Sequence, residues 1–153
     1  MRTLERHFAD YAAHHTTALN KATHTLGIPM IAAALLGLAS RIELYALPGG
    51  PRLDLGITLA AVMVTVYLAW HVGLAVGVAV LLVPLYVVGT AIPDRWAWVV
   101  LAVGVGLQYL GHMVFEGRSP AFHRNLIHTL IGPLWMAASL FEALGLYRFE
   151  AEE

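Results

Sequence analysis

Two clusters of polar residues interrupt a chain of 153 residues that is otherwise strongly apolar. In the first cluster Tyr11 and His15 are four positions apart, and so are Asn20 and His24. Residues four apart lie on the same face of a helix, so each pair places an imidazole beside a second polar group. Imidazole nitrogens bind transition metals and transfer protons near neutral pH, which makes this cluster a candidate for chemistry.

The two histidines of this cluster can face one pocket only if the helix breaks between them. His15 and His24 are nine positions apart, which places them on opposite faces of one continuous helix. Thr16 or Thr17 has the side chain that a helix N-cap needs. We therefore expect a first helix that ends near His15 and a second helix that begins near Ala18.

The second cluster consists of Gln108, His112 and Glu116, at positions i, i+4 and i+8 of an apolar segment. These three side chains share one helix face and form a polar stripe. Glycines beside the stripe would let a neighbouring helix approach closely: Gly104, Gly106 and Gly111.

Imidazoles and a carboxylate from two helices that meet at one membrane face form a site suited to iron, zinc or copper. Ionisable groups inside membrane segments are expensive, which makes them functional candidates. Other interpretations stay open: His24 and His112 could only hydrogen-bond between helices, and His15 could be interfacial without a metal. Glu116 could be an exposed carboxylate or an ion-pair partner of Arg118. The other members of the clusters are expected to orient ligands or to pack: Tyr11, Asn20 and Gln108.

The remaining histidines give weaker signals. His7, His14 and His123 are expected at the surface, whereas His71 and His128 lie deep enough in apolar sequence to reach the site. The tryptophans are predicted to form a belt at the membrane interface: Trp70, Trp96, Trp98 and Trp135.

The composition excludes most soluble classes of protein. Hydrophobic residues make up 59% of the chain and charged residues 12%, about half the charge of a soluble domain. The net charge of −1 argues against a nucleic-acid partner. Without cysteine there is no disulfide, thiolate nucleophile or iron–sulfur site. The chain is therefore expected to be one membrane-embedded helical domain over residues 1–153.

The apolar segments predict an all-α integral membrane bundle of four or five transmembrane or re-entrant helices, preceded by an amphipathic helix. The run from residue 55 to residue 90 would measure about 54 Å as one helix, nearly twice the membrane thickness. It must therefore bend back, and Trp70-His71-Val72-Gly73 is the best place. The expected spans begin near Ala18 and cover residues 18–40, 54–70, 73–90, 96–115 and 126–146, with turns at residues 47–52, 92–95 and 116–120.

If the chain crosses the membrane five times, every histidine lies at or near a helix end on the same side of the membrane as the N-terminus. Basic residues favour that side only slightly, which points weakly to the cytoplasm. Eight arginines against one lysine, with much alanine, valine and glycine, suggest a GC-rich bacterial gene. We therefore expect the bacterial inner membrane (the endoplasmic reticulum membrane if the chain is eukaryotic), with the site facing the cytoplasm.

The two clusters extend into longer motifs. The first is Tyr11-x3-His15-x4-Asn20-x3-His24-x2-Gly27-x-Pro29, and the second is Gln108-x2-Gly111-His112-x2-Phe115-Glu116-x3-Pro120-Ala121, followed by Asn125-Leu126. Together they resemble the family of fungal 2-hydroxy-fatty-acid dioxygenases, which act in the breakdown of phytosphingosine to odd-chain fatty acids, and their bacterial relatives. The resemblance covers nearly the whole chain, although residues 41–95 match only in being hydrophobic.

The resemblance implies an Fe(II)-dependent enzyme that uses O2 to remove the carboxyl carbon of a 2-hydroxy long-chain fatty acid held at the lipid bilayer. The substrate supplies all four electrons, so no flavin, 2-oxoglutarate or NAD(P)H is needed. His24 and His112 would be the firmest iron ligands, followed by His15, with Glu116 as fourth ligand or as a carboxylate beside the ligands. The resemblance further implies orienting or catalytic roles for Tyr11, Asn20 and Gln108.

Two other functions are compatible with the same residues. A zinc-dependent membrane lipid hydrolase would use Glu116 as the general base for a zinc-bound water. A non-enzymatic transporter or assembly protein would use the histidines to relay protons or to hold helices together. The sequence predicts no oligomeric state.

Overall fold

A computed structural model of the chain describes residues 3–46, 48–50, 52–120 and 127–147. The described part is mainly helical, as the apolar segments predict. Its elements in chain order are α1 (Thr3–Ala13), α2 (Ala18–Ala39), β1 (Glu43–Ala46), β2 (Arg52–Asp54), α3 (Leu55–Leu68), α4 (Val72–Ala91), α5 (Asp94–Leu110), the π-helical turn η1 (Gly111–Phe115) and α6 (Ile127–Ala143).

Side-chain caps set the two helix breaks that the sequence predicts. The Thr17 hydroxyl accepts a hydrogen bond from the Asn20 N–H at 3.2 Å and begins α2. His71 Nδ1 accepts from the Leu74 N–H at 3.2 Å and begins α4. Both predictions are confirmed, because each break needs a residue that can satisfy the free N–H groups of a new helix.

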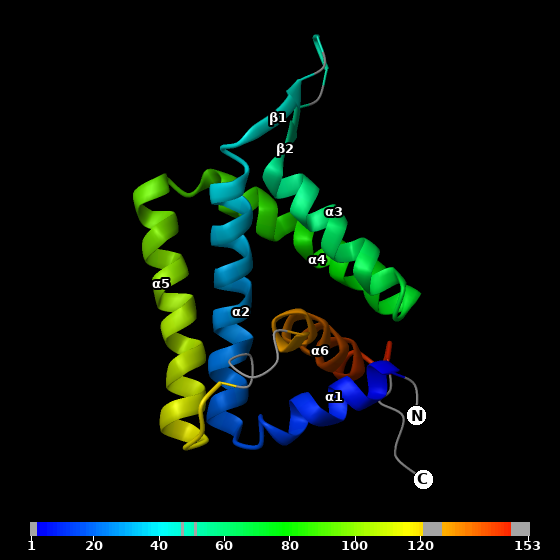
Figure 1. The fold of residues 1–153 in the computed structure, drawn as a ribbon, viewed down its shortest axis with the longest axis vertical. Helices are drawn as coiled ribbons and strands as arrows, with labels where there is room; N and C mark the ends of the chain where they lie inside the picture. Colours follow the sequence, from blue (N-terminus) through cyan, green and yellow to red (C-terminus); the bar gives the residue numbers. More distant parts are fainter. Residues whose placement is uncertain (1–2, 47, 51, 121–126, 148–153) are drawn as a thin grey trace.

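The long helices α2 and α5 run antiparallel and side by side, and the α3–α4 hairpin packs against α2 (Figure 1). Glycines bring these backbones together. A Cβ atom at Gly37 would overlap the backbone of Gly89 on α4, and one at Gly27 would overlap Gly104 and the Gln108 side chain on α5. The close approach of α2 to both neighbours therefore depends on residues without side chains.

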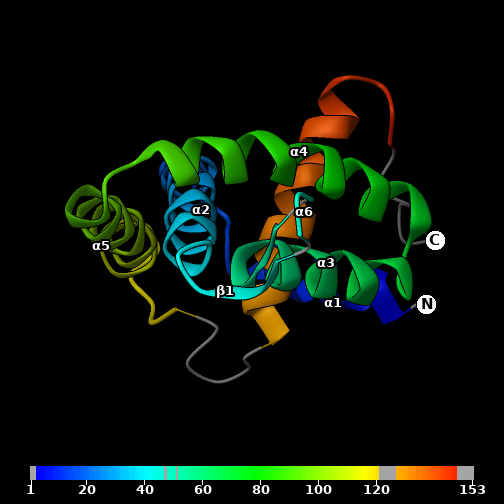
Figure 2. The same ribbon diagram turned by 90° about the horizontal axis from the view of Figure 1, so that it is seen from above.

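Helices α1 and α6 lie across the α2–α5 pair and not along it (Figures 1 and 2). The fifth crossing expected over residues 126–146 is not among the candidate spans of the described residues, which leave out residue 126. α6 has 17 residues, fewer than the roughly 20 that a full span needs, and its first turn carries His128, which bonds to α1.

Three helical segments are candidate membrane spans by their length and composition. Within the described residues, Ala18–Ala39, Val72–Ala91 and Asp94–Phe115 are long and apolar enough to cross a membrane, and Leu55–Trp70 is a shorter apolar helix. The chain is therefore a helical bundle with candidate membrane spans, as its sequence predicts.

Part of the segment expected as a loop between α2 and α3 forms a small antiparallel hairpin instead. Strand β1 pairs with β2, with Glu43 opposite Asp54 and Ala46 opposite Arg52. This hairpin projects beyond the end of α2 that lies farthest from α1 (Figure 1).

The buried core lies where the α3–α4 hairpin, α1 and α6 meet. Tyr67 of α3 is completely buried, and its hydroxyl donates to the Leu130 carbonyl of α6 at 2.6 Å. The apolar side chains around it include Phe8, Leu74, Ile131 and Leu134. This core fixes α6 and α1 against the rest of the bundle.

Candidate metal centre

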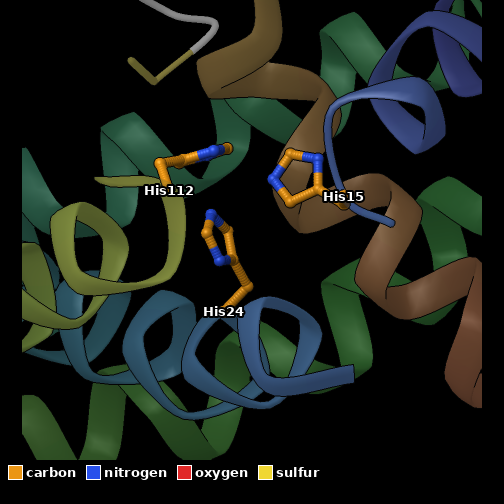
Figure 3. A group of neighbouring side chains, drawn as sticks. All are labelled: His15, His24 and His112. Atoms are coloured by element: carbon orange, nitrogen blue, oxygen red, sulfur yellow. The ribbon is translucent and has the colours of Figure 1, made fainter. Parts of the chain in front are cut away.

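Three histidines from three different segments meet at the lower end of the α2–α5 pair. His15 follows α1, His24 lies in the second turn of α2, and His112 lies in η1, and their rings point toward one another (Figure 3). One potential ligand atom from each lies within 4.8 Å of the other two. All three are buried, with at most 6% of each residue exposed.

Backbone carbonyls orient two of the rings. His15 Nδ1 donates to the Tyr11 carbonyl at 2.7 Å, and His24 Nδ1 donates to the Asn20 carbonyl at 2.9 Å. Because Nδ1 carries the proton, the lone pair lies on Nε2 of each ring. The same arrangement orients histidines in metal sites, where the second nitrogen donates to a neighbouring carbonyl or carboxylate.

The free nitrogen of His15 has an environment that favours a ligand. His15 Nε2 is buried and has no hydrogen-bond partner. Burial lowers the pKa of His15 to about 3, so the imidazole is neutral near neutral pH. A neutral imidazole is the form that binds metals, and a buried nitrogen without a partner costs folding free energy unless a ligand or water supplies one.

The π-helical turn η1 positions His112, and the sequence does not predict it. The Glu116 N–H donates to the Gly111 carbonyl, five residues earlier, at 3.1 Å. Such turns are rare and are frequent at functional sites. The wider turn changes the angle between His112 and Glu116 from the one that a regular α-helix would give.

Glu116 lies beside the three histidines and contacts the turn between α1 and α2. Its carboxylate accepts from the Thr17 N–H at 2.7 Å, the Thr16 hydroxyl at 2.8 Å and the Asn20 side-chain amide at 3.2 Å. Desolvation opposes ionisation, but these hydrogen bonds hold the pKa of Glu116 down at about 2. The ionised carboxylate thereby ties η1 to the segment that carries His15. Among the described residues, the potential ligand atoms that lie close together belong to the three histidines, and no Glu116 oxygen is one of them.

The other predicted residues of the clusters surround the histidines. Tyr11 stacks on His15, with ring centroids 3.8 Å apart and planes at 14°, and burial raises the pKa of Tyr11 above its ordinary value. Asn20 is completely buried and links Glu116 through its side chain to His24 through its carbonyl. Gln108 lies on α5 against Gly27 of α2, and its Nε2 is buried without a partner.

The other histidines that the structure describes do not join this group. His71 caps α4, and His7 packs near Trp70 at a ring distance of 6.0 Å. His128 bonds to Asp10, and His123 lies outside the described residues.

Trp135 belongs to the surroundings of the site, which the sequence reasoning missed. Its ring centroid lies 5.3 Å from that of Tyr11 and 6.5 Å from that of His15. Trp96 and Trp98 are exposed, and the belt at the membrane interface stays a prediction for all four tryptophans. No local sequence signal marks Trp135, because its contact with His15 depends on how α6 crosses α1.

The donor set suits a transition metal. Three imidazole nitrogens favour iron, zinc or copper over magnesium or calcium, which prefer oxygen. Three protein ligands would leave coordination positions open for other molecules. The buried, unpartnered Nε2 of His15 fits the same interpretation.

Comparison with known proteins identifies the family. The model of the family described as 2-hydroxy-palmitic acid dioxygenase Mpo1-like matches residues 1–144. This match covers most of the chain, which therefore belongs to that family. No curated protein and no solved structure shows significant similarity to the chain.

Proposed function

We propose, from membership of this family, that the protein is an Fe(II)-dependent dioxygenase that shortens 2-hydroxy fatty acids by one carbon. The reaction converts the 2-hydroxy acid and O2 to the shorter fatty acid, CO2 and water. The substrate is oxidised by four electrons and O2 accepts four, so no further reductant is needed. The observation that carries the proposal is the convergence of three buried imidazoles in a member of this family.

His15, His24 and His112 would hold the metal. Bound Fe(II) would supply the redox-active centre at which O2 and the substrate react. The carbonyls of Tyr11 and Asn20 keep the His15 and His24 rings in the tautomer that binds a metal. Tyr11 adds a stacked ring that restrains His15.

For Glu116 the resemblance implies a fourth ligand or a carboxylate beside the ligands, and we propose the second of these. We assign it to holding the α1–α2 turn against η1, because its two oxygens accept hydrogen bonds from Thr16, Thr17 and Asn20. In this role it keeps His15 and His112 on opposite sides of the same centre.

Gln108 is our candidate for orienting the substrate. Its buried Nε2 is a donor without a partner, it lies one helical turn from His112, and a carboxylate is a strong acceptor. The fatty acyl chain would lie along the apolar helix surfaces in the bilayer, with its head group at the end that carries the histidines. We expect this end to face the cytoplasm of a bacterial cell.

The test is a direct assay of carbon loss. The protein is purified without oxygen, loaded with Fe(II), and given 2-hydroxypalmitic acid and O2. We expect pentadecanoic acid and CO2 in equal amounts, with one O2 consumed per turnover. His15→Ala should abolish this activity, whereas His14→Ala, the same change at the partly exposed neighbouring position, should retain it. Iron-loaded protein that forms no shortened acid would refute the proposal.

The zinc hydrolase is less well supported by the geometry. A general base for a metal-bound water needs a free carboxylate oxygen at the metal, whereas both Glu116 oxygens are engaged by the α1–α2 turn. Hydrolysis of a lipid ester by the zinc-loaded protein under nitrogen would favour that alternative.

A further inference from the structure

A polar contact outside the three-histidine group joins α6 to the last full turn of α1. His128 Nε2 lies 2.8 Å from Asp10 Oδ2, and the His128 side chain is 5% exposed, whereas that of Asp10 is 51% exposed. A carboxylate can only accept, so Nε2 carries the proton and donates. His128 is therefore held in one tautomer by a carboxylate on another helix.

Stability alone does not explain a histidine at this position. With Nε2 as the donor, Nδ1 of His128 is an acceptor, and it is buried without a partner. A buried acceptor without a donor costs folding free energy, and an apolar side chain of similar size would avoid that cost. The useful property of His128 is the hydrogen bond that it donates to Asp10.

Asp10 lies in the part of α1 that presents His15. The Asp10 carbonyl accepts from His14 Nδ1 at 2.8 Å, and the next carbonyl, that of Tyr11, accepts from His15 Nδ1 at 2.7 Å. Histidine side chains thus satisfy two of the last carbonyls of the helix. A shift of this turn would move Tyr11 and, with it, the hydrogen bond that orients His15.

His15 differs from the other two histidines in how it is supported. His24 and His112 belong to helical segments that pack closely against each other, with α2 touching both α5 and η1. His15 lies two residues beyond the end of α1, a short helix that packs mainly on α6. Its position therefore depends more strongly on contacts that fix α1 to α6.

We propose that His128 is a positioning residue that acts through Asp10 to hold the last turn of α1, and thereby the His15 imidazole, at the metal centre. This inference rests on the proposed metal centre but not on the proposed reaction.

The experiment measures the affinity and the visible spectrum of Co(II) bound to the full-length protein in detergent. His128→Leu removes the donor and should weaken Co(II) binding by about 10- to 100-fold, the range seen when a ligand loses its orienting partner. The Co(II) absorption bands should shift as well, because the ligand geometry changes. His128→Gln keeps an N–H donor for Asp10 and should bind Co(II) within about threefold of the wild type.

A matched variant tests whether the loss of Co(II) affinity comes from the Asp10 contact or from any weakening of the packing of α6. Tyr67→Phe removes the hydrogen bond from Tyr67 to the Leu130 carbonyl, one helical turn or less from His128, but leaves the contact between His128 and Asp10 in place. It should leave Co(II) affinity and spectrum unchanged. Equal losses in Tyr67→Phe and His128→Leu, or a His128→Gln variant as weak as His128→Leu, would overturn the inference.

Asp10→Ala provides a second route if His128→Leu does not fold. Asp10 is half exposed, so its truncation leaves the core intact and should reproduce the loss of affinity and the spectral shift. An Asp10→Ala protein with wild-type Co(II) binding would contradict this inference but not the proposed metal centre. A wild-type protein that binds no Co(II), Zn(II) or Fe(II) overturns the proposed metal centre, and this inference with it.

Discussion

Hydrogen bonding of buried polar groups differs between the two ends of the α2–α5 pair. We call the end that carries His15, His24 and His112 the histidine end. Among the described residues, the buried side-chain atoms that lack a hydrogen-bond partner all lie at or beside the histidine end: His15 Nε2, Asn20 Oδ1, Gln108 Nε2 and His128 Nδ1. At the other end, the buried carboxylate of Asp54 accepts from the Ile57 N–H and from the Tyr86 hydroxyl. Arg41 donates to Asp94 and to the carbonyls of Thr90 and Ile92.

This difference separates polar groups that serve the fold from those that serve a ligand. Paired groups such as Asp54 and Arg41 join α2, α3, α4 and α5 where the chain turns back, and they need nothing more. Unpaired buried groups are costly for a fold and are tolerated where a bound molecule completes them. The histidine end therefore has the character of a binding site, and the opposite end has that of a structural clamp.

The largest expected effect is the loss of metal at the histidine end. His24→Ala or His112→Ala should weaken Fe(II) or Co(II) binding by more than about 100-fold, because loss of a group that merely orients a ligand already costs about 10- to 100-fold. Metal content by mass spectrometry and competition with a chelator measure this effect. If either variant still binds one metal ion tightly, the histidine end is not the metal-binding site, and the contrast with the opposite end no longer holds.

The structural clamp should show the reverse behaviour. Asp54→Ala removes the N-cap of α3 and the partner of the Tyr86 hydroxyl, and we expect it to lower the free energy of unfolding by about 2 kcal/mol or more. Metal affinity should stay at the wild-type value, because Asp54 lies at the end remote from His24. Denaturation in detergent and chelator competition measure the two quantities, and a large loss of metal affinity would contradict the division between the ends.

A smaller effect is expected where η1 contacts α2. A Cβ atom at Gly111 would overlap the side chains of Asn20 and Thr23, whereas one at Gly106 would meet nothing within 4 Å. Gly111→Ala should therefore displace η1 and weaken metal binding by about tenfold, the lower limit for a misoriented ligand. Gly106→Ala is the matched control and should bind metal like the wild type. Similar affinities in the two variants would show that η1 adapts without cost.

Local chemistry explains which features the sequence could predict. The breaks before α2 and α4 follow from capping residues and from the length of membrane spans, and the gathering of His15, His24 and His112 follows from their spacing and from the first break. The crossing direction of α6 and the contact of His128 with Asp10 depend on packing between residues far apart in the chain. The π-helical turn at Gly111 leaves no local pattern, so the position of Glu116 was predicted for a regular α-helix.

The smallest expected effect concerns the carboxylate that joins the two sides of the histidine end. The pKa of Glu116 is lowered from 4.5 to about 2, so ionised Glu116 stabilises the fold above pH 4.5 and loses this contribution as the pH falls toward 2. Glu116→Gln should lower the free energy of unfolding by about 1 kcal/mol at pH 7, and the difference from the wild type should shrink between pH 5 and pH 3. Thermal unfolding in detergent across this range measures it, with Glu142→Gln at an exposed position of α6 as the control for lost charge. A difference between wild type and Glu116→Gln that is constant with pH would mean that the charge of Glu116 does not hold the α1–α2 turn, and that the two sides of the site are joined by packing alone.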